Sequence, residues 1–410
     1  MRPRDFNERG VSVRSGLRVL LVGGNANNGA NAGPFYWNAN NAASNTNANI
    51  GRQLCFTLQQ PRNSLPLGKK QNDRAACAGR GRPERSKVMK QMKRYGNLWE
   101  DVCSLDNIAL AHARAKRGKA HYAEVRMVEA DQQRYFLEIR RMLADKTFKN
   151  SPYTVLIRTE GPKEREIWRL PYYPDRIIHH CIINVLEPIF MRGYIRDTYA
   201  ALPGRGIHDG VRRVRKALRD VAGTRFCLKL DVRKFYQSVD HDVLKSALRR
   251  NIKDADLLWL LDAIIDSAPG VPIGNYTSQH FANFVLSGFD HWVKEALGAS
   301  YYFRYCDDMV LLGADKAQLH DWRRRIAAYL ADVLQLEVKG NWQVFPVADR
   351  GIDFLGYRFF HGYTLVRKSI VKNFKRRFRA GDRRSMAAYN GWFQWANTHN
   401  LQQRYDWRTA

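Results

Sequence analysis

From about residue 95 onward, apolar residues follow two different periods along the chain. Spacings of three and four predict amphipathic helices, and they occur at 105–143, 178–189, 211–218 and 319–334. Short apolar runs predict buried strands, and these occur at 226–230, 301–303, 309–312 and 334–338. Asp175 precedes the second helical stretch and is expected to cap it. Together these elements indicate an α+β fold.

The first ninety residues lack such periodicity. Residues 25–51 are almost free of charge and hold ten asparagines, a residue with poor helix and strand propensity. Residues 61–91 combine Pro, Gly, Lys and Arg without a pattern. We therefore expect 1–60 to be a disordered or irregular extension, followed by a basic linker over 61–91.

The 410-residue chain has a net charge of +29, with 68 Lys and Arg against 39 Asp and Glu. Residues 1–91 hold 15 basic and 4 acidic side chains, so +18 remains for 92–410. A basic excess spread this widely favours a polyphosphate partner such as a nucleic acid. A basic surface that serves solubility alone is the alternative.

Six scattered cysteines form no CxxC pair and no zinc spacing, which is typical of a reducing cytosol. Neither a secretory signal nor a run of 18 apolar residues occurs, so no contact with a membrane is expected. These features favour a cytoplasmic protein.

Three acidic residues carry the candidate chemistry. Asp307 and Asp308 lie between two apolar segments, at the tip of a predicted hairpin, and Asp231 ends a separate predicted strand. An Asp-Asp pair by itself is usually a solvated turn. Like charges fixed side by side repel unless a cation lies between them. Three carboxylates from neighbouring strands therefore predict a two-metal site for phosphoryl transfer.

The Tyr305-Cys306-Asp307-Asp308 hairpin and the strand that ends at Asp231 resemble the palm of reverse transcriptases, and further motifs follow in the family's order from about residue 95 to 400. The resemblance implies a right-hand polymerase fold, with fingers, a palm whose antiparallel sheet is backed by helices, and a short helical thumb. The implied bounds are fingers with the start of the palm 92–225, palm 226–362 and thumb 363–410.

The resemblance also assigns the acids. Asp231, Asp307 and Asp308 are the expected catalytic residues and would hold two Mg²⁺ ions, with the Val232 carbonyl as an extra ligand. Tyr236 matches the position whose ring lies against the sugar of the incoming nucleotide and excludes a 2′-hydroxyl; an ordinary core aromatic is the alternative.

Basic residues at alternate positions of a predicted strand, 163–171, suit a triphosphate because alternation places them on one face. The alternative is a solvated edge strand. The resemblance favours Lys163 and Arg165 as the pair that grips the nucleotide, with Arg169 as a further candidate. Lys339 matches a family lysine near the triphosphate.

Two glycine-containing segments are expected to contact template and primer. Arg205 and Gly206 belong to a turn that enters a helix, an arrangement that binds phosphate, and Leu355 and Gly356 match the region that grips the primer. Basic and aromatic side chains over 366–410 suit an RNA–DNA duplex.

Ile273, Gly274 and Gln279 indicate the subtype, because most reverse transcriptases carry Gln before this glycine and Pro at the position of Gln279. The pattern resembles the reverse transcriptases of diversity-generating retroelements. Gly274 would permit close contact with the nucleotide, and Ile273 would replace a polar check of the base pair with apolar bulk. Residues 16–52 resemble a translated template repeat, so translation is hypothesised to begin at Met89 or Met92.

The resemblance thus implies an RNA-directed DNA polymerase that copies a template-repeat RNA into adenine-mutagenised cDNA and so diversifies a target gene. Its implied partners are the retroelement RNA, the RNA–cDNA duplex, dNTPs and a small, basic, oligomeric accessory variability protein. Three alternatives remain: a group II intron-like or retron-type reverse transcriptase, a catalytically inactive RNA-binding scaffold, and a lectin-like binder at the N-terminus.

Overall fold

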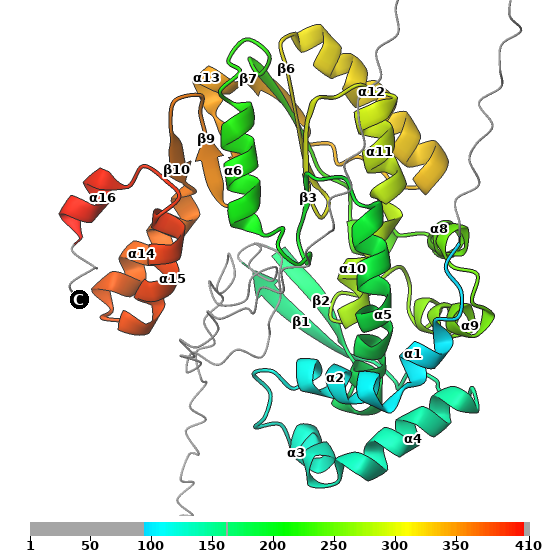
Figure 1. The fold of residues 1–410 in the computed structure, drawn as a ribbon. Helices are drawn as coiled ribbons and strands as arrows, with labels where there is room; N and C mark the ends of the chain where they lie inside the picture. Colours follow the sequence, from blue (N-terminus) through cyan, green and yellow to red (C-terminus); the bar gives the residue numbers. More distant parts are fainter. Residues whose placement is uncertain (1–93, 161–162, 406–410) are drawn as a thin grey trace, which may run out of the picture.

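A computed structural model describes residues 94–160 and 163–405 of the chain. The Asn-rich segment, the basic linker and the hypothesised start at Met89 or Met92 lie outside these residues. Figure 1 shows three groups of elements, with a sheet and its helices between a lower group of helices and a smaller group at the C-terminus. This is the expected right-hand polymerase fold, with palm, fingers and thumb.

A five-stranded sheet forms the palm, in the order β3-β5-β6-β4-β7. All neighbours are antiparallel except β3 and β5. The strands are β3 (Thr198–Tyr199), β4 (Phe226–Leu230), β5 (Tyr301–Tyr305), β6 (Asp308–Gly313) and β7 (Gln343–Pro346).

The two faces of this sheet bury two separate cores. Because successive side chains of a strand point to opposite faces, Leu228 and Leu230 enter one core while Cys227 enters the other. α12 (Lys316–Leu334) covers the first face through Leu319, Trp322, Ile326, Leu330 and Leu334, the stripe that its periodicity predicts. α6 (Ile207–Ala217) contributes to the core on the opposite face.

Further helices complete the palm (Figure 1). They are α7 (Phe235–Ser238), α8 (His241–Asn251), α9 (Ala255–Ile265), α10 (Tyr276–Val285), α11 (Ser287–Glu295) and α13 (Val347–Arg350).

The fingers consist of helices and one hairpin that projects toward the space between palm and thumb (Figure 1). The hairpin strands pair in antiparallel register, from Thr154 opposite Arg169 to Glu160 opposite Lys163. The elements are α1 (Trp99–Cys103), α2 (Leu105–Ala115), α3 (Ala123–Ala130), α4 (Gln132–Ala144), β1 (Thr154–Glu160), β2 (Lys163–Arg169), η2 (Tyr172–Arg176) and α5 (Ile177–Gly193).

A second, three-stranded sheet and three helices end the described chain. The sheet joins the palm to the thumb helices, and the core on the α6 side of the palm continues into all of them. The elements are β8 (Ile352–Phe354), β9 (Tyr357–Phe359), β10 (Thr364–Val366), α14 (Lys368–Arg379), α15 (Arg383–Phe393) and α16 (His399–Arg404).

Three local predictions were wrong. Asp175 does not cap α5, because its carboxylate accepts hydrogen bonds from the Ser151 backbone N–H (2.8 Å) and hydroxyl (2.7 Å). Residues 334–338 form no strand, since Leu334 ends α12 and only Val338 makes an isolated bridge. Leu105, expected on the buried face of its helix, is 37% exposed.

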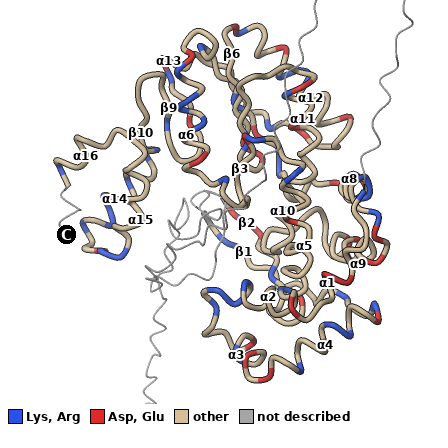
Figure 2. Tube along the Cα trace, viewed as in Figure 1, with Lys and Arg blue, Asp and Glu red and all other residues tan. Residues whose placement is uncertain are grey.

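Basic residues occur on many elements of the described chain, from α4 in the fingers to α14 and α15 in the thumb (Figure 2). Among the described residues, no helix combines the length and the apolar character that a membrane crossing needs.

Candidate active site

The palm strands bring the three predicted carboxylates to one edge of the sheet. Leu230 of β4 pairs with Met309 of β6, so Asp231, the next residue, lies beside Asp308. A two-residue connection, Cys306-Asp307, joins β5 to β6 because Tyr305 and Asp308 pair across the hairpin. The sequence prediction that these acids converge from two strands therefore holds in the structure.

Asp307 and Asp231 are in direct contact through their carboxyl groups. The pKa of Asp307 lies well above its ordinary value, first because of burial, and then because of the negative charge of Asp231 and the hydrogen bond between the two groups. Without a cation, this contact requires a shared proton. The pair therefore fits a divalent metal, whose charge would replace that proton.

Asp308 has a different environment. Lys229 Nζ donates to both of its carboxylate oxygens, at 2.8 and 3.0 Å, and also to the backbone carbonyl of Asp353 at 2.5 Å. Burial raises the pKa of Asp308, and the nearby Lys229 opposes that shift. Within the described ranges, no three Asp, Glu, His or Cys side chains are arranged to ligate one ion. The geometry thus brings Asp231 and Asp307 together and ties Asp308 to a lysine.

Lys339, expected near the triphosphate or the active site, lies beside the carboxylate of Asp231. Its backbone N–H donates to the Asp231 carbonyl at 2.8 Å, and its Nζ lies 3.6 Å from Asp231 Oδ2. One residue further, Val232 pairs with Val338 in an isolated antiparallel bridge. Backbone pairing therefore holds the Lys339 ammonium beside the carboxyl pair of Asp231 and Asp307.

Tyr236 contacts the turn Cys306-Asp307 between β5 and β6, which we call the catalytic turn after its candidate catalytic residue Asp307. Its hydroxyl donates to Cys306 Sγ at 3.7 Å, and its backbone carbonyl accepts from the Val271 N–H at 2.7 Å. The residue is half-buried. Burial raises the pKa of the Cys306 thiol to about 12, which keeps the thiol protonated and unsuited to nucleophilic attack.

The loop that carries Ile273 is bound to the fingers hairpin. Trp168 of β2 donates its N–H to the Ile273 carbonyl at 2.8 Å, and Asn275 Nδ2 donates to the Tyr153 hydroxyl at 2.7 Å. Gly274 has a φ of +132°, and a Cβ there would overlap the Trp168 carbonyl. We expected the glycine to approach the nucleotide; its close approach in the structure is to β2. Gln279 lies half-buried on α10.

The predicted cations of β2 fall at different depths of the hairpin. Arg165 is half-buried opposite Arg158. Arg169, at the base, places its guanidinium over the Tyr122 ring, 5.8 Å from the centroid, and so contacts the fingers helices. Lys163 belongs to β2, but its side chain lies outside the described part of the chain. Of the predicted β2 cations whose side chains are described, Arg165 is therefore nearer the hairpin tip than Arg169.

The residues predicted to contact template and primer take part in packing. Arg205 donates to the Ile195 carbonyl at 2.7 Å, and Gly206 precedes the first residue of α6. The Leu355 side chain is buried against Gly210 of α6, and a Cβ on Gly356 would overlap the Trp392 ring. Both segments therefore pack against neighbouring elements of the fold.

Sequence reasoning missed two charged residues in otherwise apolar strands, Lys229 in β4 and Arg304 in β5. Lys229 neutralises Asp308, and Arg304 is fully buried with Asp290. Their signal was available, because a charge inside an apolar strand requires a partner. Lys229 finds its partner on the neighbouring strand β6, where Asp308 lies, and Arg304 finds its partner on the preceding helix α11, where Asp290 lies.

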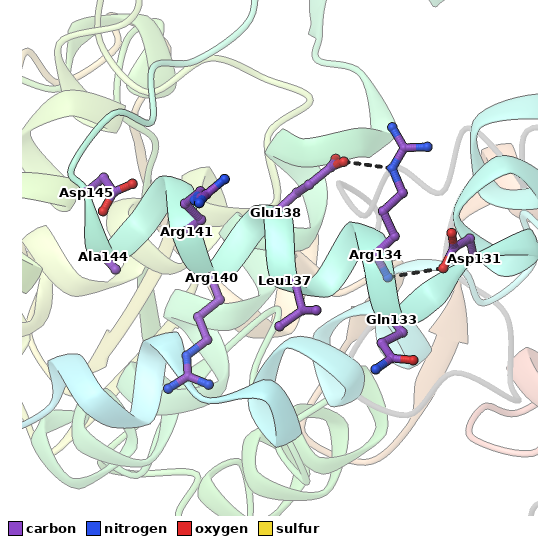
Figure 3. A pocket seen from close by; sticks show the side chains of 9 residues that line it. All are labelled: Asp131, Gln133, Arg134, Leu137, Glu138, Arg140, Arg141, Ala144 and Asp145. Atoms are coloured by element: carbon purple, nitrogen blue, oxygen red, sulfur yellow. Dashed lines mark hydrogen bonds and ion pairs between the residues drawn. The ribbon is translucent and has the colours of Figure 1, made fainter.

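A hollow of about 790 Å³ runs along α4 and is lined by charged side chains such as Arg134, Glu138 and Arg141 (Figure 3). α4 lies at the end of the fingers away from the palm sheet (Figure 1). The hollow is therefore separate from the carboxylates.

Residues 161–359 match the family described as "Reverse transcriptase (RNA-dependent DNA polymerase)". The chain is similar to Protein YkfC of Escherichia coli, with 26% identity over 46% of this chain and 61% of that protein. It is also similar to the Group II intron-encoded protein LtrA of Lactococcus lactis, with 21% identity over 38% of this chain and 28% of that protein. The matches thus span less than two thirds of each relative.

Among solved structures, the telomerase of Candida albicans in complex with a fragment of telomeric RNA is similar with a TM-score of 0.41. The identity is 13%, over 52% of this chain and 44% of that chain.

Proposed function

We propose that this chain, whose residues 161–359 form a reverse transcriptase domain related to group II intron-encoded proteins, is an active RNA-directed DNA polymerase. The observation that carries the proposal is the carboxyl–carboxyl contact between Asp231 and Asp307 beside Lys339. Two half-buried carboxyl groups in contact repel each other once both are ionised, so the contact itself lowers stability. A metal-dependent nucleotidyl transferase needs them.

Each residue of the site has a proposed role. Asp231 and Asp307 would hold Mg²⁺, with the Val232 carbonyl as a further ligand. Asp308, which is paired with Lys229, would be an additional carboxylate ligand. Bound Mg²⁺ would supply Lewis-acid activation of the primer 3′-hydroxyl and charge compensation for the leaving pyrophosphate. The triphosphate would be oriented, and its negative charge neutralised, by Lys339, Arg165 and Lys163.

Primer extension tests the activity. Full-chain protein should extend a DNA primer on an RNA template in the presence of Mg²⁺ and dNTPs. Asp231→Asn and Asp307→Asn should each reduce the rate on the order of 10³-fold or more, because the two carboxylates act as a unit. Asp321→Asn, an exposed acid on α12, is the matched control and should extend normally. Equal extension by all four proteins would reject the catalytic roles of Asp231 and Asp307, and extension by none of them would leave the scaffold interpretation.

We further propose that the enzyme serves a diversity-generating retroelement. Ile273 and Gln279 support this, because an apolar side chain at the Ile273 position offers no hydrogen bond with which to check a base pair. The substrates would be dNTPs and a retroelement RNA with its template repeat, in the cytoplasm, and a small basic oligomeric protein would assist. The product would be cDNA with errors opposite template adenine.

Sequencing the cDNA tests this subtype. Ile273→Gln should lower misincorporation opposite adenine by about fivefold, the worth of one hydrogen bond of ~1 kcal/mol. Ile273→Val keeps the apolar surface and should keep the errors. Uniform accuracy opposite all four template bases in the unmodified enzyme would instead favour a group II intron-like enzyme, to which the similarity with LtrA points.

A further inference from the structure

Behind the catalytic turn lies a fully buried guanidinium. Arg304 of β5 is 0% exposed, and its bidentate pair with Asp290 of α11 has contacts of 2.7 Å from Nε and 2.6 Å from Nη2. Asp290 also accepts from the Tyr302 hydroxyl at 2.7 Å and from the Thr198 hydroxyl at 3.0 Å. The charge is thus paired and its partner is saturated with hydrogen bonds.

Arg304 reaches the turn itself through its remaining nitrogen. Nη1 donates to the Cys306 carbonyl at 2.9 Å, and to Asn283 Oδ1 at 3.1 Å. Cys306 has a φ of +53°, a left-handed conformation that L side chains rarely adopt. Such a residue persists only where its surroundings fix it. The carbonyl held by Arg304 belongs to the peptide that leads directly into Asp307.

The same network extends to a second strained segment. Asn283 Nδ2 donates to the Ala200 carbonyl at 2.9 Å. Ala200 and its neighbour Ala201 both have left-handed backbones, with φ of +82° and +51°. Asn283 therefore connects Arg304 to the loop that leads into the Arg205 turn.

We propose that Arg304 is a positioning residue: held by Asp290 and Asn283, it fixes the Cys306 carbonyl and so presents the Asp307 carboxylate to the metal ions. This inference rests on the proposed polymerase function. A buried ion pair is seldom more stable than apolar residues of the same volume. The hydrogen bond from Arg304 to the Cys306 carbonyl gives this ion pair a role beyond packing, because it fixes the conformation of the turn.

Metal binding tests this role without catalysis. Mn²⁺ uptake by full-chain protein, measured by electron paramagnetic resonance, reports on the Asp231 and Asp307 pair. Arg304→Lys keeps the charge beside Asp290, but a single ammonium cannot also reach Asn283 and Cys306. It should weaken Mn²⁺ binding roughly 10- to 100-fold, as loss of an outer-sphere orienting group does, and raise the Mg²⁺ concentration needed for primer extension correspondingly.

Two controls separate positioning from general stability. Tyr302→Phe and Thr198→Val each remove one hydrogen bond to Asp290 and leave the contact between Arg304 and Cys306 intact. Both should lower the unfolding temperature while Mn²⁺ affinity stays within about twofold of the unmodified protein. A loss of Mn²⁺ affinity in these controls equal to that in Arg304→Lys would overturn the proposal.

Asn283→Ala provides a second, milder variant if Arg304→Lys does not fold. It keeps the ion pair and removes one anchor of the guanidinium, so a smaller loss of Mn²⁺ affinity is expected. If the unmodified protein binds Mn²⁺ normally and every folded variant keeps that affinity, the positioning role of Arg304 is rejected. The proposed polymerase function then still stands. An unmodified protein that binds no Mn²⁺ and extends no primer rejects the proposed function as well.

Discussion

At the scale of single residues, Tyr236 is constrained from two sides. Its hydroxyl contacts Cys306 in the catalytic turn, and its backbone carbonyl holds Val271. Gly270 has a φ of +60°, and a Cβ there would overlap the Tyr236 carbonyl. The Tyr236 ring therefore has little freedom to move, as its proposed role in excluding a 2′-hydroxyl requires.

Replacing Tyr236 with Ala should lower the discrimination between deoxynucleotides and ribonucleotides by roughly 10²-fold, because the space that excludes a 2′-hydroxyl opens. The ratio of kcat/KM for dTTP and UTP measures this. Tyr236→Phe keeps the ring and loses only the contact with Cys306, so its discrimination should stay unchanged. Normal sugar selection in Tyr236→Ala would show that another residue excludes the hydroxyl.

At the scale of elements, α5 and α10 bury histidines against each other. His180 stacks on Tyr276 with 3.6 Å between ring centroids. Burial lowers the pKa of His179 to about 3 and of His280 to about 4, and it lowers the pKa of His180 well below its ordinary value. These imidazoles are therefore neutral in the fold.

Acid should destabilise the protein through these histidines. The unfolded chain takes up protons near pH 6.5, whereas the fold excludes them until about pH 4 or 3. Stability is therefore complete above pH 6.5 and falls as the pH drops below it, by about 1.4 kcal/mol per pH unit for each histidine. Denaturant unfolding at pH 7 and pH 5 measures the slope. His280→Gln should reduce it by one histidine's share; an unaltered slope would contradict the assignment.

The contact between the Ile273 loop and β2 gives a second prediction for elements. Gly274→Ala would force a Cβ into the Trp168 carbonyl, so we expect a loss of roughly 1–3 kcal/mol in unfolding free energy and a higher KM for dNTPs as the hairpin shifts. Gly288→Ala on α11, where a Cβ meets no atom within 4 Å, is the control and should change neither quantity. Equal behaviour of the two variants would mean that the contact with β2 is dispensable.

The spacing of apolar residues was enough to predict helices and strands whose burial follows a single period. The stripe from Leu319 to Leu334 predicted α12 except for its first three residues, and the apolar run before Asp231 predicted β4. Features that depend on distant partners escaped prediction. Asp175 bonds Ser151, Gly274 avoids Trp168, and Arg304 pairs with Asp290. None of these pairings has a fixed spacing in the sequence, so only the tertiary fold reveals them.

At the scale of the whole molecule, part of the basic excess forms a stripe on the thumb. α14 in the thumb buries Ile370 and Phe374 and exposes a stripe of cations at helical spacing on its outer side. The exposed residues are Lys368, Lys372, Arg376 and Arg379. Residues three and four apart lie on one face of a helix, so this stripe is a continuous basic surface suited to a phosphate backbone.

Salt dependence should reveal that surface. The double variant Lys372→Gln, Arg376→Gln should weaken binding of an RNA–DNA duplex and lower the slope of log affinity against log salt by about two, one for each lost phosphate contact. Arg323→Gln, Arg324→Gln on α12 removes the same charge from the other side of the palm and should leave the slope nearly intact. Fluorescence anisotropy over a series of salt concentrations measures both.

The core on the α6 side of the palm also determines how the parts of the enzyme can be recombined. Tyr305 and Val310 of the palm, Phe354 and Phe359 of the small sheet, and Phe374 of the thumb belong to one apolar cluster. A chimaera cut between β10 and α14 would divide that cluster and expose both halves. A graft from a related polymerase would have to begin before β8 and bring its own small sheet, and it would function only with a palm surface of matching shape.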